Sequence, residues 1–510
     1  MTNVILDKSK RGWWKRAVFY QIYPKSFQDT TGSGVGDLNG IISRLDYLQK
    51  LGVDGIWLSP VCASPQVDNG YDISDYCAID PMFGTLEDMQ MLIREAKDRG
   101  ISIILDLVLN HTGNNHSWFL TAVEYLQTLP EGAGPDPEVC PYVDYYTFVR
   151  ADSCPNGYSA VAGTENWFYE SKFSYDMPDL NLANENVRSD IRDIMKFWID
   201  KGVSGFRLDA AKEFYSGSID KNVEVLNWIQ TTATELKPDC YLVAEVWENF
   251  GTIKQYYESG ITSIFNFAFG NSNGKIPQVI RGAGSPTTVQ SYATALETSD
   301  TGYFEYNPAY IDAPFLSNHD VGRIAGFVNR DPLKMKMAAA MNVLMSGSCF
   351  IYYGEEIGMV GSGNDPSKRA PMVWNDARDN GTTNPPPECQ LPEEYPLGSL
   401  ETQRYDDASL YNYYRQVIAI RNALPVISHG RTSAETALNV DCVSAQRKTW
   451  GEESCIILMN VDAVAAEVDL SGYADWELVA SLSADGNEIA MDGSNLTIPA
   501  FGVAILRPAM

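Results

Sequence analysis

Short apolar runs and amphipathic stretches alternate along the first 360 residues of this chain. The runs are apolar throughout instead of alternating between apolar and polar positions, a pattern typical of parallel strands covered on both faces. Because strand and helix alternate eight times, the pattern predicts an α/β fold built as a closed (β/α)8 TIM barrel. The eight runs occupy residues 17–24, 55–60, 101–111, 205–210, 241–247, 263–269, 313–320 and 349–356.

The stretches between the runs repeat apolar residues at helical spacing, as expected of helices that pack one face on a sheet. Residues 40–52 place one isoleucine and three leucines on such a face. Residues 85–100 open with a Thr-x-x-Asp capping sequence and close on a glycine. Residues 187–202 have the same periodicity and also close on a glycine. Each of these stretches predicts one helix.

Two parts of the chain depart from this alternation. The stretch from His111 to Asn186 is rich in proline, glycine, tyrosine and aspartate and is too long for one crossover. It predicts an inserted domain B after the third strand. From about residue 428 the apolar runs are short and alternating, which predicts a small antiparallel β domain. The predicted division is barrel domain A in two parts, 1–111 and 185–427, inserted domain B at 112–184, and the C-terminal β domain at 428–510.

The formal net charge is −28, which makes the chain strongly acidic. Nucleic acids and anionic membrane surfaces require a basic face, so neither is expected as a partner. No run reaches the roughly 18 apolar residues of a membrane helix, and residues 1–16 lack the apolar core of a signal peptide. Nine cysteines without a CxxC pair favour a reducing, cytoplasmic location. In an exported protein, Cys140 and Cys154 would be the candidate disulfide.

Three acidic residues lie at or near the ends of predicted strands: Asp209, Glu245 and Asp320. In a parallel α/β barrel the carboxyl ends of the strands form the active-site face. Three carboxylates that meet there can act as acid, base and nucleophile on one bound substrate. The alternative for any single residue is a structural role, because acids often cap strands and begin helices.

Substitution at an acetal carbon requires a proton on the leaving oxygen and electron density on the carbon, which two carboxyls supply. Arg207 lies two residues before Asp209 and points to the same side of its strand, so it is expected to keep that carboxylate ionised as the nucleophile. Glu245 has apolar neighbours, which favour the protonated acid. Asp320, beside His319, is then expected to hold substrate hydroxyls.

The chain contains only four histidines. His111 and His319 end predicted strands beside acids and are interpreted as donors to sugar hydroxyls. His116 and His429 are interpreted as structural. A zinc site is the rival interpretation of the histidines at 111 and 116, but their spacing is not the helical spacing of metal ligands.

Four segments taken together resemble the ordered sequence regions of the α-amylase family, glycoside hydrolase family 13. They are DLVLNH (106–111), GFRLDAAK (205–212), EVWE (245–248) and FLSNHD (315–320). The resemblance implies a barrel, a domain B after strand three and a C-terminal β-sandwich. It also implies a retaining mechanism that needs no cofactor, with Asp209 as nucleophile, Glu245 as acid/base and Asp320 as transition-state stabiliser.

The same resemblance implies a set of residues that bind the sugar. Arg207 matches the family's arginine, and His111 and His319 match its two substrate-binding histidines. Tyr71 matches the aromatic residue that stacks under the sugar. Asp106 matches the aspartate that braces the arginine.

The features that decide substrate length conflict with one another. DNGYDISDY (68–76) resembles oligo-1,6-glucosidases, in which the residue matching Asp68 caps the non-reducing end and enforces exo action. MPDLN (177–181) instead resembles a subgroup intermediate between oligo-1,6-glucosidases and neopullulanases, which includes bacterial α-amylases. Arg404 is a candidate second partner in closing the pocket, and a solvated loop arginine is the alternative.

On the leaving-group side, Lys212 matches a lysine used by amylases. Glu213 departs from the usual histidine, which puts the contacts of that subsite in doubt. The predicted substrate is a malto-oligosaccharide or related α-glucan with α-1,4 or α-1,6 bonds. A transglycosylase or a sucrose- or trehalose-type isomerase on the same site is the alternative, since either shares the covalent intermediate. A non-catalytic transporter heavy chain is a further rival, but it would need a membrane anchor.

Residues 29–37 resemble the short calcium loop of this family. Threonine and serine replace two stronger oxygen ligands, which weakens Ca²⁺ binding and leaves both a bound structural Ca²⁺ and an empty loop open. The predicted ligands are Asp29, Thr31, Ser33, the Val35 carbonyl and Asp37.

Overall fold

A computed structural model describes residues 12–509 of the chain. Its centre is a sheet of eight parallel strands in the order β12-β11-β10-β9-β5-β2-β1-β13. Two backbone hydrogen bonds join the end strands: Ser348 N–H donates to the Asp312 carbonyl and Phe350 N–H to the Pro314 carbonyl, both at 2.8 Å. These bonds close the predicted barrel. The strands are β1 (Val18–Ile22), β2 (Gly55–Leu58), β5 (Ser102–Leu107), β9 (Gly205–Leu208), β10 (Tyr241–Ala244), β11 (Ser263–Phe265), β12 (Ile311–Ala313) and β13 (Cys349–Tyr352).

The register of three neighbouring strands prepares the functional site. Asp106 of β5 is the parallel partner of Arg207 of β9. Leu208, the last residue of β9, pairs with Ala244, the last residue of β10. Because the next residue on each strand is an acid, Asp209 and Glu245 emerge side by side from the same edge of the barrel.

Helices cover the outside of the barrel, as the apolar spacing predicts. The helix predicted at 40–52 is in fact two helices, α1 (Leu38–Ser43) and α2 (Leu45–Leu51), which meet at Arg44. The guanidinium of Arg44 donates to Gln28 and lies 4.1 Å from the centre of the Trp374 ring, and these contacts hold the chain at the break. The apolar residues expected on one face are nevertheless buried.

The ends of two other helices agree closely with the sequence. Thr85 and Asp88 form a reciprocal capping box at the start of α3, and Gly100 follows that helix with a φ of 74°. Helix α5 starts at Glu185, slightly before the predicted position, because the Asn184 side chain caps it. The longer helices are α3 (Leu86–Asp98), α4 (Ser117–Thr128), α5 (Glu185–Asp200), α6 (Ile219–Leu236), α9 (Pro286–Tyr306), α11 (Pro332–Val343) and α14 (Leu410–Ala423). The shorter helices are α1 (Leu38–Ser43), α2 (Leu45–Leu51), α7 (Phe250–Tyr256), α8 (Lys275–Arg281), α10 (Ile324–Phe327), α12 (Asp365–Lys368), α13 (Leu400–Gln403) and α15 (Val426–His429).

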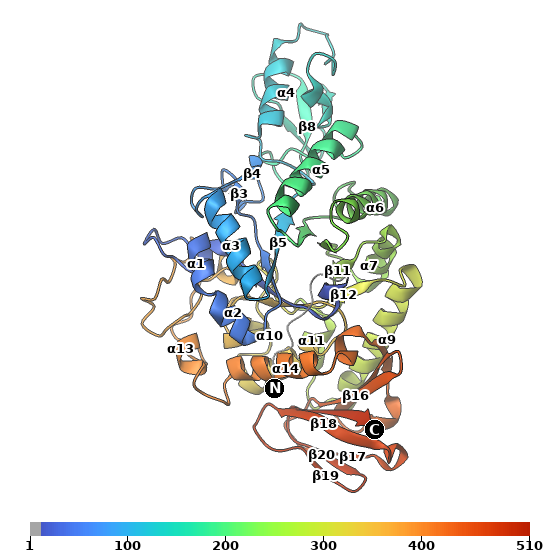
Figure 1. Ribbon diagram of the computed structural model, residues 1–510. Helices are drawn as coiled ribbons and strands as arrows, with labels where there is room; N and C mark the ends of the chain where they lie inside the picture. The colour runs from blue at the N-terminus through green and yellow to red at the C-terminus, as the bar shows by residue number, and fades with distance from the viewer. Residues whose placement is uncertain (1–11, 510) are drawn as a thin grey trace.

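The long segment between β5 and α5 folds as a separate unit of small elements. It carries α4 and a three-stranded antiparallel sheet in the order β6-β8-β7, and it projects from one end of the barrel (Figure 1). An inserted unit at this place agrees with the sequence, and the limits 112–184 remain a prediction. Its strands are β6 (Phe148–Arg150), β7 (Tyr158–Ala160) and β8 (Trp167–Glu170), and a hairpin of β3 (Cys62–Ala63) and β4 (Asp75–Ile79) precedes it in the chain.

The C-terminal part forms two antiparallel sheets at the opposite end of the molecule from the inserted unit (Figure 1). Five strands follow the order β14-β15-β16-β21-β18 and three the order β17-β20-β19. A cluster of buried side chains that includes Ile456, Val468 and Leu496 draws on both sheets. This confirms the expected antiparallel β domain. The strands are β14 (Arg431–Ala434), β15 (Val443–Trp450), β16 (Glu453–Asn460), β17 (Ala466–Asp469), β18 (Trp476–Ser483), β19 (Ala490–Asp492), β20 (Asn495–Ile498) and β21 (Gly502–Pro508).

The cysteines are free, and the two singled out from the sequence do not form a disulfide. Cys140 is buried with its Sγ near the Thr121 carbonyl, whereas Cys154 is exposed with its Sγ near the Tyr158 carbonyl. Within residues 12–509, no helix has the length and apolar character needed to span a bilayer.

Candidate active site

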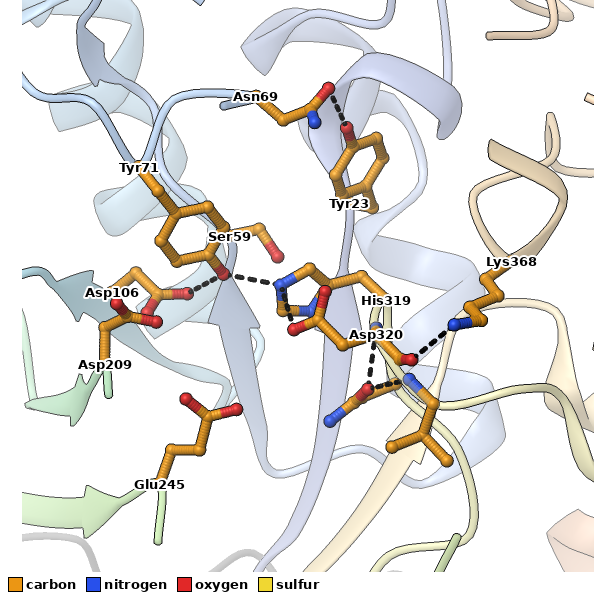
Figure 2. A network of polar contacts seen from close by, with 12 residues as sticks. Tyr23, Ser59, Asn69, Tyr71, Asp106, Asp209, Glu245, His319, Asp320 and Lys368 are labelled. Atoms are coloured by element: carbon orange, nitrogen blue, oxygen red, sulfur yellow. Dashed lines mark hydrogen bonds and ion pairs between the residues drawn. The ribbon is translucent and has the colours of Figure 1, made fainter. Parts of the chain in front are cut away.

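A cavity of about 260 Å³ opens at the carboxyl ends of the barrel strands. It brings together most of the residues that the sequence singles out, and Figure 2 shows the polar network around it. Asp106 and Arg207 lie directly beneath this group and are buried. The predicted residues that line the cavity are Asp68, Tyr71, His111, Asp209, Lys212, Glu245, His319 and Asp320.

Arg207 is the centre of the charge arrangement. Its side chain is 1% exposed and contacts three carboxylates. Nη1 lies 2.5 Å from Asp106 Oδ1 and 2.6 Å from Asp209 Oδ1, and Nη2 lies 3.1 Å from Glu245 Oε2. One rigid guanidinium therefore fixes two acids at adjacent strand ends relative to each other.

Asp106 holds Arg207 from below. Its second oxygen, Oδ2, accepts hydrogen bonds from Trp57 Nε1 at 2.8 Å and from the Tyr71 hydroxyl at 3.1 Å. The side chain is fully buried. This geometry agrees with a bracing role, because each carboxylate oxygen of Asp106 is occupied by a donor from a separate element.

Burial raises the pKa of both Asp209 and Glu245, and the Arg207 cation opposes the rise at each. For Glu245 this direction agrees with the sequence-based expectation. For Asp209, Arg207 is expected to keep the carboxylate ionised, but desolvation outweighs this cation and raises the pKa well above its usual value. Arg207 lies closer to Asp209, at 2.6 Å, than to Glu245, at 3.1 Å, so it stabilises the charged form of Asp209 more strongly.

Glu245 is also held by backbone. Ala210 N–H donates to Glu245 Oε2 at 3.1 Å, and Ala211 N–H donates to the Glu245 carbonyl at 3.0 Å. Ala210 has a φ of 45°, in the left-handed region that non-glycine residues rarely adopt. This conformation, directly after Asp209, turns the N–H toward the neighbouring acid.

The third acid, Asp320, is not at the end of a strand. Strand β12 ends at Ala313, so residues 314–320 form an irregular segment that carries the acid to the cavity. Asp320 Oδ2 lies 3.0 Å from His319 Nε2, and Asp320 Oδ1 lies 2.9 Å from Arg369 Nη2. Burial raises the pKa of Asp320, but His319, Arg369 and Arg207 outweigh it and lower the pKa below its usual range. Asp320 is therefore ionised.

Arg369 is a residue of the cavity lining that the sequence interpretation missed. It lines the cavity, and its Nε donates to the His319 carbonyl at 3.1 Å. The neighbouring Lys368 donates to the Asp320 carbonyl at 2.7 Å. The only signal in the sequence was a pair of cations in the loop-like stretch 361–408, where nothing indicates that the chain returns to the barrel.

The two cavity histidines are neutral. Burial lowers the pKa of His111 to about 4 and that of His319 to about 3. His319 Nε2 lies 2.7 Å from the Tyr71 hydroxyl, and Nδ1 lies 2.9 Å from Gln21. His111 Nε2 is buried and, among residues 12–509, has no hydrogen-bond partner. The residue His111 itself lines the cavity.

A tight loop positions Asp68 and Tyr71. The fully buried Asp72 accepts hydrogen bonds from the backbone N–H groups of Val67 and Asp68, at 2.9 and 3.0 Å. Asn69 and Gly70 have φ values of 56° and 100°, which turn the chain back toward the barrel. Burial raises the pKa of Asp68, while Arg369 opposes the rise.

The remaining lining residues include charged and aromatic side chains that the sequence did not assign to the site. Glu213 lines the cavity beside Lys212, as do the rings of Phe173 and Trp247. The position of Trp247, two residues after Glu245, was a usable signal. Phe173 lies in the inserted segment, where sequence spacing gives no indication of contact.

The structure does not bring Arg404 to the cavity. It follows α13 on the surface, with its guanidinium 4.5 Å from the centre of the exposed Tyr405 ring. Arg369 occupies the place in the cavity lining for which Arg404 was the candidate. The reason is that the segment 361–408 first passes the cavity and only afterwards runs to α13.

The oxygen atoms of the suggested calcium loop are already used within the loop. Asp29 accepts from the backbone N–H groups of Thr31, Gly32 and Gly34, and Asp37 accepts from those of Thr30 and Gly40. The Val35 carbonyl accepts from the Ser33 hydroxyl. Within residues 12–509, no group of three or more His, Cys, Asp or Glu side chains could hold a metal ion. These hydrogen bonds order the loop around its two carboxylates.

The arrangement can protonate a leaving oxygen and attack the carbon that bears it. Comparisons with known proteins agree. A sequence profile described as alpha amylase, catalytic domain, matches residues 21–430. The chain is 37% identical over 424 residues to alpha-amylase 3 of Dictyoglomus thermophilum, covering 82% of this chain and 79% of that protein.

Further relatives carry other names. The chain is 33% identical to the oligo-1,6-glucosidase of Heyndrickxia coagulans, covering 82% of this chain and 87% of that protein. It is 30% identical to the trehalose-6-phosphate hydrolase of Escherichia coli, covering 88% of this chain and 91% of that protein. Among solved structures, Eubacterium rectale Amy13B aligns with a TM-score of 0.92 at 39% identity, covering 97% of this chain and 96% of that one.

Proposed function

Because the chain belongs to the α-amylase family of glycoside hydrolases, which act on α-glucosidic bonds, we propose that it is a retaining enzyme that removes single glucosyl units from short malto-oligosaccharides. The observation that carries the proposal is the Arg207 guanidinium, which holds both Asp209 and Glu245. Two carboxyls held by one side chain favour the short separation of retaining glycosidases.

In the first step, Asp209 Oδ attacks the anomeric carbon and the glycosidic C–O bond breaks. The departing oxygen takes the proton of Glu245, whose pKa is raised by burial. A glucosyl ester on Asp209 results. In the second step Glu245, now a carboxylate, removes a proton from water, the hydroxide attacks the same carbon, and the ester bond to Asp209 breaks. The configuration at that carbon is retained.

Three side chains support the sugar during both steps. Asp320 is ionised, so it can accept hydrogen bonds from two sugar hydroxyls as positive charge develops on the ring. His111 lines the cavity, so its ring is offered to a further hydroxyl. The Tyr71 ring, fixed by its hydroxyl to Asp106 and His319, offers a flat face.

Asp68 and Arg369 support exo action. Both line the cavity, and in residues 12–509 neither the Asp68 carboxylate nor Arg369 Nη1 has a hydrogen-bond partner. The Asp68 carboxylate can accept a hydrogen bond and Arg369 Nη1 can donate one. Together they suit the free 4- and 3-hydroxyls of a terminal sugar. A longer chain would have to pass between them.

A time course of product lengths from maltoheptaose tests this function. Glucose and maltohexaose are expected from the first time point. Asp68→Ala should lose activity on maltotriose while sparing maltoheptaose. An early mixture of maltose and maltotriose would refute exo action. New products longer than the substrate would point to the transglycosylase alternative, and isomerised disaccharides from sucrose to the isomerase.

Three further points accompany the proposal. The relatives are named for neutral and for phosphorylated substrates, so family membership leaves the charge of the substrate open. The nine free cysteines support a cytoplasmic location. The calcium prediction for residues 29–37 is not carried into the proposal, since the loop oxygens are occupied by donors.

A further inference from the structure

The leaving-group side of the cavity carries two opposite charges, and each already has a partner outside the cavity lining. Lys212 Nζ lies 3.0 Å from Glu248 Oε1 and 3.1 Å from the Trp247 carbonyl. Glu213 Oε2 lies 3.2 Å from Lys172 Nζ and also accepts a hydrogen bond from the Ser216 hydroxyl at 2.5 Å. The direct distance between Lys212 Nζ and Glu213 Oε1 is longer, 4.0 Å. Two lysines and two glutamates therefore form an alternating, neutral row.

Lys172 reaches this row from the inserted segment, two residues after β8 ends at Glu170. Its backbone N–H donates to Asp179 Oδ2 at 2.9 Å, and Asp179 Oδ1 accepts from Asn110 Nδ2 at 3.1 Å. Asn110 directly precedes His111 in the cavity lining. The backbone of Lys172 is thereby fixed to the barrel, and its side chain spans from the inserted segment to the loop after β9.

Two exposed rings complete this side of the cavity. Trp247 is 40% exposed and stacks on Phe267, with ring centres 5.2 Å apart and planes 14° apart. Phe173 is 47% exposed, and its ring centre lies 5.3 Å from that of His111. Large aromatic faces left open beside a polar cavity suit the C–H faces of an uncharged sugar, because they bury apolar area without requiring a counter-charge.

We propose that Glu213, positioned by Lys172, binds hydroxyl groups of the leaving-group sugar and restricts the enzyme to neutral saccharides. This inference rests on the proposed glycosidase function. A 6-phosphate on the leaving group would need an unpaired cation, but within residues 12–509 Lys212, the cation lining this side of the cavity, is paired with Glu248. The phosphate would also face the Glu213 carboxylate. A neutral sugar needs no unpaired cation and is not repelled by the Glu213 carboxylate.

The test compares two substrates with the same glucosyl unit and different leaving groups, maltotriose and p-nitrophenyl α-glucoside. In Glu213→Gln, kcat/KM for maltotriose should fall at least about tenfold, the effect of weakening hydrogen bonds to a charged group. For p-nitrophenyl α-glucoside it should stay within about twofold, since that leaving group has no hydroxyl. Glu224→Gln is the matched control, because Glu224 pairs with Arg188 and neither residue lines the cavity.

Lys172→Met tests the positioning role independently of the glutamate. It should raise KM for maltotriose with little change in kcat or in p-nitrophenyl α-glucoside turnover, and Lys172→Arg should restore KM. An unchanged ratio between the two substrates in both Glu213→Gln and Lys172→Met would overturn the proposal. No turnover of either substrate by the unaltered enzyme would instead refute the proposed function.

The exclusion of phosphate has its own measurement, inhibition by glucose 6-phosphate relative to glucose. Glucose 6-phosphate should inhibit the unaltered enzyme no more strongly than glucose does. Glu213→Gln, which leaves Lys172 without its partner, should shift the ratio toward glucose 6-phosphate. Inhibition of the unaltered enzyme by glucose 6-phosphate at least about tenfold tighter than by glucose would contradict an exclusion of phosphate.

Discussion

Replacing Asp106 with asparagine removes one buried charge beneath the cavity and keeps the size of the side chain. In the structure, Oδ1 receives Arg207 Nη1 and Oδ2 receives Trp57 and Tyr71. An asparagine offers one oxygen and one NH2 group, so at least one of these donors must face another donor. The mismatch should cost about 1.5–3 kcal/mol of unfolding free energy, the usual value for a hydrogen bond to a charged group.

That cost corresponds to a small change in melting temperature. With an unfolding entropy of about 2.1 cal/mol/K per residue, 510 residues give about 1.1 kcal/mol/K, so the midpoint should fall by about 1.5–3 °C. Turnover should fall by about 10²-fold, because Arg207 then moves relative to the two acids. Differential scanning calorimetry and kcat on p-nitrophenyl α-glucoside measure both effects.

The pH profile separates this reasoning from simple loss of structure. The Asp106 charge raises the pKa of both Asp209 and Glu245. Its removal should therefore lower both pKa values and move both limbs of the kcat/KM profile to lower pH. Asp312→Asn is the control, since Asp312 is a buried barrel carboxyl bonded to Asn266 outside the cavity lining. A profile that stays in place, or moves to higher pH, would refute the reasoning.

Three further predictions concern the nucleophile, the core and the calcium loop. Asp209→Asn should lower kcat by at least about 10⁴-fold, and near-normal turnover would exclude Asp209 as nucleophile. Burial raises the pKa of Glu355 from its usual 4.5 to about 8 and that of Glu356 to about 7. The folded protein thus keeps protons that the unfolded chain has lost, so this stabilisation is complete below pH 4.5 and disappears as the pH rises through 7 to 8. In denaturant titrations across pH 5–8, Glu356→Gln should lessen the fall in unfolding free energy with rising pH. An equally steep fall in this variant would show that Glu356 does not cause it. Chelation with EDTA should leave the melting temperature within about 1 °C, because the carboxylates of Asp29 and Asp37 are occupied by backbone donors; a larger fall, reversed by Ca²⁺, would contradict this.

The barrel and its central chemistry could be predicted because local pattern and strand register carry them. Continuous apolar runs identified the strands, and alternation along β9 placed Arg207 and Asp209 on one side. Glu245 is identified from its own apolar run, whereas Asp106 is expected beside Arg207 only from the family resemblance. The pairing of β9 with β5 and β10 brings both acids to Arg207.

Other features depend on contacts between segments far apart in the chain, and the sequence could not reveal them. Arg369 reaches Asp320 from a long irregular segment, while Arg404, a better match by position, remains on the surface. The break between α1 and α2 follows from the contact of Arg44 with Trp374. The Lys172–Glu213 pair joins the inserted segment to the barrel. The sequence around Lys172 and the sequence around Glu213 give no sign that these residues meet.

The central claim is that Asp209 forms a covalent glucosyl ester while Glu245 transfers the proton. Incubation with 5-fluoro-α-glucosyl fluoride slows the second step, and mass spectrometry of a proteolytic digest then locates the trapped sugar. A single glucosyl label on the peptide that contains Asp209 is expected. A label on any other carboxylate, or full turnover without a trapped ester, would contradict the account.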